Sequence, residues 1–335
     1  MGRQNLLLAI VTLAGGISWL TSAGIAGQSA GGRTIPAELL APKGWTPPRT
    51  PWGDPDLQGT YTNNSEGGTP FERPAEFGGR RLEDVRGEEL AQVRRRIQDQ
   101  AVERTSDALS GPNWFNENLS HDRGLQAWLI VDPPDGKLPP ETPEARQRAA
   151  ARPARRGAAD SHKDFNLFDR CITRGLPGSM MPAIYGNSYE IVQGPGFVAI
   201  RYEMIHEARV IPLDGRPRAG ASIRQYMGDA RGRWEGDTLV VETTNFRDEA
   251  AFRGANGGTL RITERFTAIR PDAVKWAVTV DDPRTWTRSW TFAMPLTRDD
   301  QPLPSYECHE GNLGLQYMLS AARAEEARAG ATPSR

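Results

Sequence analysis

Few side chains in this sequence are suited to acid-base or metal chemistry, because it contains only four histidines. Two of them are followed by a glutamate, in His206-Glu207 and His309-Glu310. A histidine beside a carboxylate can act as a general base or acid, since its pKa lies near neutral pH and the carboxylate stabilises its charged form. We therefore predict that both pairs contribute to one catalytic site. The alternative is two hydrogen-bonded structural histidines.

The two cysteines of the chain are Cys171 and Cys308. They are expected to form a disulfide, because the N-terminal residues described below predict export to an oxidising compartment. The alternative is two separate buried thiols. A disulfide would bring Arg170 and Arg174 close to His309. Arginine binds carboxylates and stabilises developing negative charge. The pattern predicts a lyase or hydrolase that acts on a small polar substrate, such as an oxidised sugar or another carboxylate-bearing molecule.

A second chemical hypothesis makes His206, His309 and Glu310 ligands of a divalent metal, for which imidazole and carboxylate groups are suitable donors. Adjacent residues on a strand point to opposite faces, so His309 and Glu310 can ligate together only from a loop. The sequence has no His-x-x-x-His or Cys-x-x-Cys spacing to strengthen this hypothesis. It also has no Walker-type phosphate loop and no Gly-x-Gly-x-x-Gly motif, so no nucleotide cofactor is expected.

The N-terminal residues have the layout of a secretory signal. Arg3 precedes an uncharged apolar run from Leu6 to Leu20, and small residues follow as far as Ala26. The run is shorter than the roughly 20 residues that a membrane-spanning helix needs. We expect residues 1–26 to be removed and the protein to be periplasmic or secreted, without a stable membrane span. A retained anchor is the alternative.

The charge of the chain is balanced, with 41 basic and 42 acidic side chains and a net charge of -1. This balance gives no electrostatic reason to expect binding to nucleic acid or to an anionic membrane surface. A small molecule or a neutral saccharide is the expected partner.

The chemistry-bearing residues are expected to lie on one mainly β domain, residues 57–335, after a proline-rich arm over residues 27–56. An amphipathic surface helix is predicted at 81–105, a flexible insertion at 138–160 and a terminal helix at 313–328. Strands are predicted at 56–63, 128–131, 189–193, 196–202, 208–213, 222–227, 233–235, 238–246, 259–269, 274–281 and 285–295. Their short connections can join only antiparallel neighbours, which predicts a meander that closes as a barrel.

Four segments, 169–175, 203–209, 228–241 and 308–312, resemble a group of exported, functionally uncharacterised bacterial proteins. The resemblance covers the chain from about Pro51 onward and implies export without implying an activity. The barrel also resembles lipocalins, whose first strand carries Gly-x-Trp and whose last strand carries an arginine that packs on it. Gly59-Thr60-Tyr61 and Arg288 are placed to fill these positions, although Tyr61 and the helical insertion depart from the lipocalin pattern.

The same barrel fits a second class of function, a periplasmic protein that binds a small molecule without catalysis. In this interpretation Tyr226, Trp234 and Trp286 line a ligand pocket, although aromatic residues at strand spacing are more often core. An envelope interaction protein that uses the proline-rich arm is a third class. Activity across a broad substrate panel separates an enzyme from a binding protein.

Overall fold

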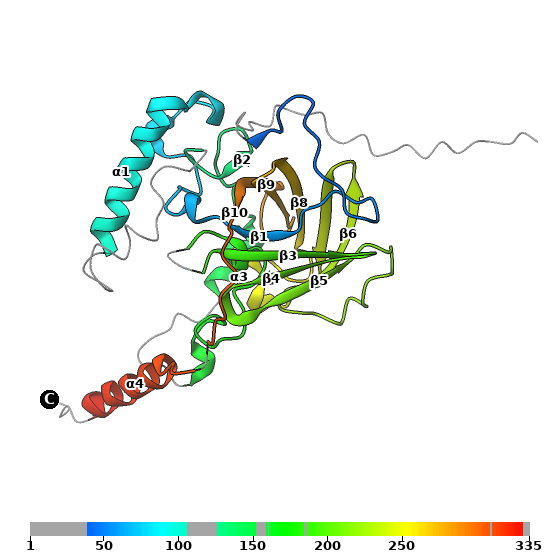
Figure 1. Ribbon diagram of the computed structural model, residues 1–335. Coiled ribbons are helices and arrows are strands. Elements are labelled where there is room, and N and C mark those ends of the chain that lie inside the picture. Colours follow the sequence, from blue (N-terminus) through cyan, green and yellow to red (C-terminus); the bar gives the residue numbers. More distant parts are fainter. Residues whose placement is uncertain are drawn as a thin grey trace, which may run out of the picture. The chain divides into compact units, whose positions relative to one another are not determined.

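The structure is a computed structural model that describes residues 39–105, 126–151, 159, 161–183, 186–308 and 310–330, all within one compact unit. Its central feature is a ten-stranded antiparallel sheet in the order β5-β4-β3-β1-β10-β9-β8-β7-β6, with β2 pairing to β10 beside this path (Figure 1). The strands are β1 (Gly59–Thr62), β2 (Ile130–Asp132), β3 (Ser188–Gly194), β4 (Phe197–Tyr202), β5 (Ala208–Pro212), β6 (Asp229–Glu235), β7 (Thr238–Thr244), β8 (Arg261–Arg270), β9 (Ala273–Asp281) and β10 (Trp290–Arg298).

The sheet is nearly closed as a barrel, which confirms the predicted fold class. Closure brings β5 and β6 together. A Cβ added at Gly232 of β6 would lie 2.8 Å from Ile211 of β5 and 2.5 Å from Leu213, so this glycine allows the two strands to approach. Alternate side chains of each strand point into the barrel and fill it. On β8, for example, Ile262, Glu264 and Phe266 are fully buried, while the residues between them are partly exposed.

The two ends of the barrel differ in their connections. One end, which we call the turn end, has the two-residue turns 195–196, 236–237 and 271–272. The other end, the loop end, has the longer connections 203–207, 245–260 and 282–289. The segment 161–183 before β3 also reaches the loop end, where Leu176 and Met180 join the barrel core. Short 3-10 helices occur at η2 (Asn64–Glu66), η3 (Ala75–Phe77), η4 (Leu82–Asp84), η5 (His162–Asp164), η6 (Gly178–Met180), η7 (Met204–His206), η8 (Asp248–Ala250) and η9 (Phe252–Gly254).

A second hydrophobic layer covers the outside of the barrel beside β2 and β10, where α1 (Gly87–Thr105) lies (Figure 1). Val93 of α1 belongs to the same buried cluster as Trp128 and Ala293. Arg94 ties α1 to the loop after β1, because its guanidinium lies 3.5 Å from the buried carboxylate of Glu66. The surface helix predicted at 81–105 is confirmed from Gly87 onward, whereas Leu82–Asp84 form the separate 3-10 helix η4. Among the described residues, no helix combines the length and apolar character needed to cross a membrane.

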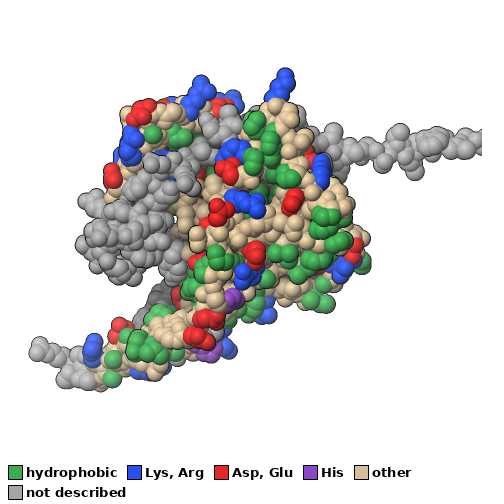
Figure 2. All heavy atoms as spheres, in the orientation of Figure 1, with side chains coloured by type: hydrophobic (Ala, Val, Ile, Leu, Met, Phe, Trp, Pro, Cys, Tyr) green, Lys and Arg blue, Asp and Glu red, His purple; other side chains and the backbone are tan. Residues whose placement is uncertain are grey.

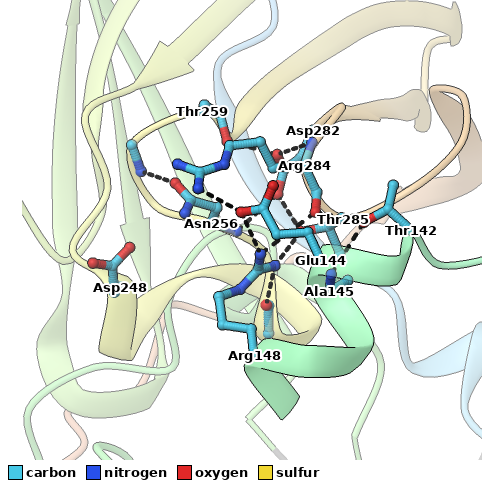
Figure 3. A network of polar contacts seen from close by, with 12 residues as sticks. Thr142, Glu144, Ala145, Arg148, Asp248, Asn256, Thr259, Asp282, Arg284 and Thr285 are labelled. Atoms are coloured by element: carbon cyan, nitrogen blue, oxygen red, sulfur yellow. Dashed lines mark hydrogen bonds and ion pairs between the residues drawn. The ribbon is translucent and has the colours of Figure 1, made fainter. Parts of the chain in front are cut away.

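Part of the insertion that was expected to be flexible forms a helix, α3 (Pro143–Ala150), so the prediction of an unstructured 138–160 is wrong for these residues. The Thr142 hydroxyl accepts a hydrogen bond from the backbone N–H of Ala145 and caps the helix. Arg148 then fixes the helix to the barrel by donating to Thr285 Oγ1 at 2.7 Å (Figure 3). This alanine-rich segment is thus ordered by a cap and by two arginine contacts with the 282–289 connection, from Arg148 to Thr285 and from Arg284 to Glu144, which composition alone does not reveal.

The buried carboxylate of Asp282 organises the same region. It accepts hydrogen bonds from the backbone N–H of Asn256, at 2.7 Å, and from the hydroxyls of Thr259 and Thr285 (Figure 3). These bonds join the 245–260 and 282–289 connections. Thr285, where this strand was predicted to begin, is thus held in the connection, and β10 begins at Trp290.

Two further strand predictions are corrected. Residues 222–227 form no strand, and Gln225 forms only an isolated bridge, to Phe246 in the connection after β7. Residues 229–232, which lie between the predicted strands 222–227 and 233–235, form the first half of β6 and pair with residues 241–244 of β7. The ladder with β7 outweighs the turn propensity of Asp and Gly in this segment.

The arginine that meets Tyr61 is Arg298, not the expected Arg288. The Arg298 guanidinium lies 5.9 Å from the Tyr61 ring, and it lies so close to Gly59 that a Cβ there would be 2.8 Å from Arg298 Nη2. Arg288 lies at the other end of β10 and pairs with Asp132 at 3.0 Å. The C-terminal helix is confirmed as α4 (Gly314–Gly330), which packs through Ala322 against a small cluster with Phe165.

Candidate functional site

A pocket of about 620 Å³ lies at the loop end, between the 166–181 segment and the 245–260 connection. The first wall consists of Asn166, Leu167, Phe168, Thr173, Arg174, Gly175, Leu176, Gly178 and Met181, and the second of Glu249, Ala250, Ala251, Phe252 and Arg253. Its volume falls within the range of small-molecule sites, about 300–1,000 Å³. Charged side chains of both signs are interspersed over the face of the molecule shown in Figure 2.

Arg174 is the predicted site residue that lies in the first wall. Its guanidinium lies over the Phe168 ring, 5.5 Å from the centroid. One terminal nitrogen, Nη1, is buried and has no hydrogen-bond partner among the described residues. Buried polar atoms are nearly always hydrogen-bonded, so an unpaired guanidinium nitrogen requires an explanation.

Arg253 lies in the opposite wall and was not singled out from the sequence. Its guanidinium lies 4.3 Å from the Phe71 ring centroid and 5.7 Å from that of Phe252. Its backbone has a φ of 51°, which a non-glycine residue adopts only at an energetic cost. Within the described part of the chain, no carboxylate forms an ion pair with Arg253 or with Arg174. Each wall therefore presents an arginine stacked on a phenylalanine.

Glu207 lies directly behind the first wall. Its Oε2 accepts a hydrogen bond from the Ser179 hydroxyl at 3.2 Å and from the backbone N–H of Arg174 at 3.3 Å. Burial raises the pKa of Glu207 above its ordinary value of 4.5, although hydrogen bonds from Thr173, Arg174 and Ser179 and the charge of Arg174 act in the opposite direction. This carboxyl therefore keeps its proton to a higher pH than an exposed glutamate does.

Glu207 is held in place by a buried ion pair two residues further along the chain. Arg209, on β5, forms a two-pronged pair with Glu264 of β8 at 2.5 and 2.8 Å inside the barrel. Trp276 Nε1 also donates to Glu264, at 3.0 Å. These bonds fix the start of β5 against the opposite barrel wall. The 203–207 connection that carries Glu207 is therefore attached to a rigid strand.

His206 points away from its neighbour Glu207. Its Nε2 lies 3.2 Å from Ser305 Oγ and 4.0 Å from a carboxylate oxygen of Glu307, in an exposed position. His206 and Glu207, which were predicted to act as one unit, thus contact different groups.

The Cys171–Cys308 disulfide is present, as predicted, with the two Cα atoms 5.9 Å apart. It joins the 166–181 wall to the segment 305–308, which already lies beside His206. The structure therefore brings His206 close to the residues that immediately precede His309. His309 itself lies outside the described residues, so a shared His206–His309 site stays a prediction.

The remaining predicted site residues, Arg170 and Glu310, do not line the pocket. Arg170 is partly buried one residue before Cys171, and Glu310 is exposed. Among the described residues, no group of three or more His, Cys, Asp or Glu side chains is arranged to hold a metal ion. The metal hypothesis for His206, His309 and Glu310 is left as a prediction, since it depends on His309.

The three aromatic residues expected to line a ligand pocket occupy other positions. Trp286 is buried in the barrel core, 5.4 Å from Trp290. Trp234 packs against the core from β6, and Tyr226 lies under the guanidinium of Arg247 at 4.8 Å. The aromatic rings of the observed pocket are instead those of Phe168 and Phe252. Both lie in loops whose sequence carries no periodic signal.

The chain matches no protein-family model and no curated protein. The case for its function therefore depends on the geometry of the pocket and its surroundings.

Proposed function

We propose that this protein is exported and binds a small carboxylate-bearing molecule in the loop-end pocket. The observation that carries the proposal is Arg174, a pocket-lining residue whose guanidinium lies over the Phe168 ring. Its Nη1 is buried without a hydrogen-bond partner among the described residues, which costs about 1–3 kcal/mol, and an anion that draws the guanidinium toward the pocket would remove this cost. A carboxylate is the natural acceptor, because two parallel N–H···O bonds match the guanidinium fork.

The apolar side chains of the pocket support a ligand with a hydrocarbon or ring body. Leu167, Leu176 and Met181 lie in one wall and Phe252 in the other. Small-molecule sites commonly combine such a lining with a few polar groups that fix orientation. The ligand class is therefore a small acid rather than a simple inorganic anion.

Export is supported by two features. The first is the signal-like layout of residues 1–26, which lie outside the described residues. The second is the disulfide between Cys171 and Cys308, since disulfides persist mainly in oxidising compartments.

The experiment compares two probes of equal shape, hexanoate and hexanamide, by isothermal titration calorimetry. We expect hexanoate to bind about tenfold or more tightly than hexanamide, as a charge-assisted hydrogen bond of about 1.5–3 kcal/mol implies. Arg174→Gln should abolish the difference. Arg201→Gln is the matched control, because Arg201 pairs with Glu190 on the outside of the barrel at 2.9 Å. Equal binding of the two probes by the wild type would refute the proposal.

A second candidate function, a lyase or hydrolase acting on the bound acid, is favoured by Glu207. A carboxyl with a raised pKa can donate a proton to a leaving group, and Glu207 lies directly behind the pocket wall. The test is turnover of 4-nitrophenyl esters and 4-nitrophenyl uronosides by the wild type and by Glu207→Gln. Turnover that Glu207→Gln abolishes while hexanoate binding persists supports an enzyme. Absence of turnover across the panel favours plain ligand binding.

A further inference from the structure

The arrangement of the two arginines carries an inference that rests on the proposed function and narrows its ligand class. We propose that the natural ligand carries two anionic groups on an apolar body, one recognised by Arg174 and the other by Arg253. Arg253 is then a specificity-determining residue of the pocket. A ligand with one anionic group would pair with only one of the two arginines.

The first support is the symmetry of the two walls. Arg174 lies over Phe168 in one wall, and Arg253 lies over Phe252 and Phe71 at the other. Stacking on an aromatic ring restricts the motion of a guanidinium. Its N–H groups, which lie in the plane of the guanidinium itself, stay available to an acceptor. Both cations are thus positioned before a ligand arrives.

The second support is the charge balance of the pocket. Glu249, the carboxylate among the lining residues, forms an ion pair with Arg247 at 2.8 Å. Glu207 is hydrogen-bonded by the Ser179 hydroxyl and by the backbone, and the charge of Arg174 acts on Glu203 and Glu207 without a direct ion pair. Glu72 acts on the charge of Arg253 in the same way. Neither arginine forms a direct ion pair among the described residues, so each can form one with an anionic group of a ligand.

The third support is the backbone of Arg253. Its φ of 51° precedes Gly254, which has a φ of 74°, within the short helix η9. An arginine in this left-handed conformation is strained, and strained residues that persist are concentrated in ligand sites and active sites. The conformation directs the Arg253 side chain over Phe71 and Phe252.

The experiment measures binding of α,ω-dicarboxylates, from succinate to suberate, against monocarboxylates of the same chain length. The wild type should bind one dicarboxylate about tenfold or more tightly than its matched monocarboxylate, if the second ion pair contributes as much as a charge-assisted hydrogen bond. Arg253→Gln should abolish this preference, so that each dicarboxylate binds no more tightly than its matched monocarboxylate. Arg253→Lys, which keeps the charge, should restore part of it.

Arg224→Gln is the matched control for a general effect of charge. Arg224 pairs with Asp248 of the same 245–260 connection at 3.1 Å but does not line the pocket. A loss of preference in Arg224→Gln as large as in Arg253→Gln would overturn the inference, because it would show a field effect rather than recognition. Near-UV circular dichroism of each variant confirms that the aromatic core is intact.

Three other outcomes also decide between these ligand classes. Equal affinity of the wild type for every matched pair of acids overturns the two-anion inference but leaves carboxylate binding standing. Failure of any carboxylate to bind more tightly than hexanamide overturns the proposed function itself. Hexyl phosphate is the probe for a dianion at one end only, and its binding as tightly as the best dicarboxylate, without dependence on Arg253, would also overturn the inference.

Discussion

The two ends of the barrel differ in which residues adopt a positive φ. At the turn end, Gly196 and Gly236 supply the positive φ values, 82° and 59°, that the tight turns require. At the loop end the described chain places five non-glycine residues in this region, Cys171, Ile205, His206, Asn245 and Arg253. Strain of this kind is stable only where the surroundings enforce it. The loop end is therefore built for placing side chains, and the turn end for closing the sheet.

The ends also differ in what holds them together. At the turn end, Arg298 packs against Gly59 and over the Tyr61 ring, so packing closes the first strand onto the last. At the loop end, the disulfide joins the pocket wall to the segment 305–308. If this comparison is right, each end should respond to its own substitutions.

The largest effect is expected for removal of the disulfide by the double substitution Cys171→Ser and Cys308→Ser. The cysteines are separated by 137 residues, for which the chain-entropy model gives about 5 kcal/mol of lost unfolding free energy. Urea denaturation measures this loss. Hydrogen exchange should accelerate in 161–181 and at 299–308 but not in the turn 194–197. Uniform acceleration at both ends would contradict the separation of the two regions.

A smaller effect is expected at the turn end for Gly59→Ala. Gly59 has a φ of 139°, and the added Cβ would lie 2.8 Å from Arg298 Nη2. We expect a loss of about 2 kcal/mol, since a left-handed conformation costs an L-residue about 1–2 kcal/mol and the arginine must also move. Hexanoate binding at the loop end should be unchanged.

Gly196→Ala is the matched control for Gly59→Ala. Gly196 has a φ of 82°, but an added Cβ would meet no atom within 4 Å. Its cost therefore reports the backbone conformation alone, and the difference between the two variants reports the contact with Arg298. Equal losses would show that the Arg298–Tyr61 contact contributes nothing to closure.

The sequence predicted the turn end better than the loop end, for physical reasons. Strands such as β3, β4, β8 and β9 are defined by alternation, and their turns by Gly, Pro and Asp, which are local signals. The loop end depends on non-local contacts. The sequence indicated the Cys171–Cys308 pair because only two cysteines are available. It also singled out Arg174 and Glu207, both of which lie at the pocket.

Arg253 could not be found in the same way. It lies in a long connection without periodicity, and its position over Phe71 depends on the packing of segments about 180 residues apart, as the residue numbers show. The opposite directions of His206 and Glu207 were equally hidden, because they follow from the positive φ values of 63° at Ile205 and 56° at His206. Because His206 and Glu207 are adjacent in the sequence, they were predicted to act as one unit. The backbone conformation instead directs their side chains to different surroundings.

The smallest effect concerns the pH dependence of stability at the loop end. The pKa of Glu207 is raised in the folded protein by burial, so the folded state binds this proton more tightly than the unfolded state does. The stabilisation from this group is complete below its unfolded pKa, near 4.5, and is lost as the pH rises through the raised folded pKa. The free energy of unfolding of the wild type relative to Glu207→Gln should therefore fall with rising pH across this window, with a slope below about 1.4 kcal/mol per pH unit, the limit for one proton.

Ser179→Ala sharpens this prediction. The Ser179 hydroxyl donates to the Glu207 carboxylate and lowers its pKa, so removing it should move the decline to a higher pH. The measurement is urea denaturation of the wild type, Ser179→Ala, Glu207→Gln and the double variant between pH 4 and 8. A difference that rises with pH would mean that the folded protein favours the charged carboxylate. Glu207 would then be an acceptor that holds the Arg174 wall in place, rather than a proton donor beside the pocket.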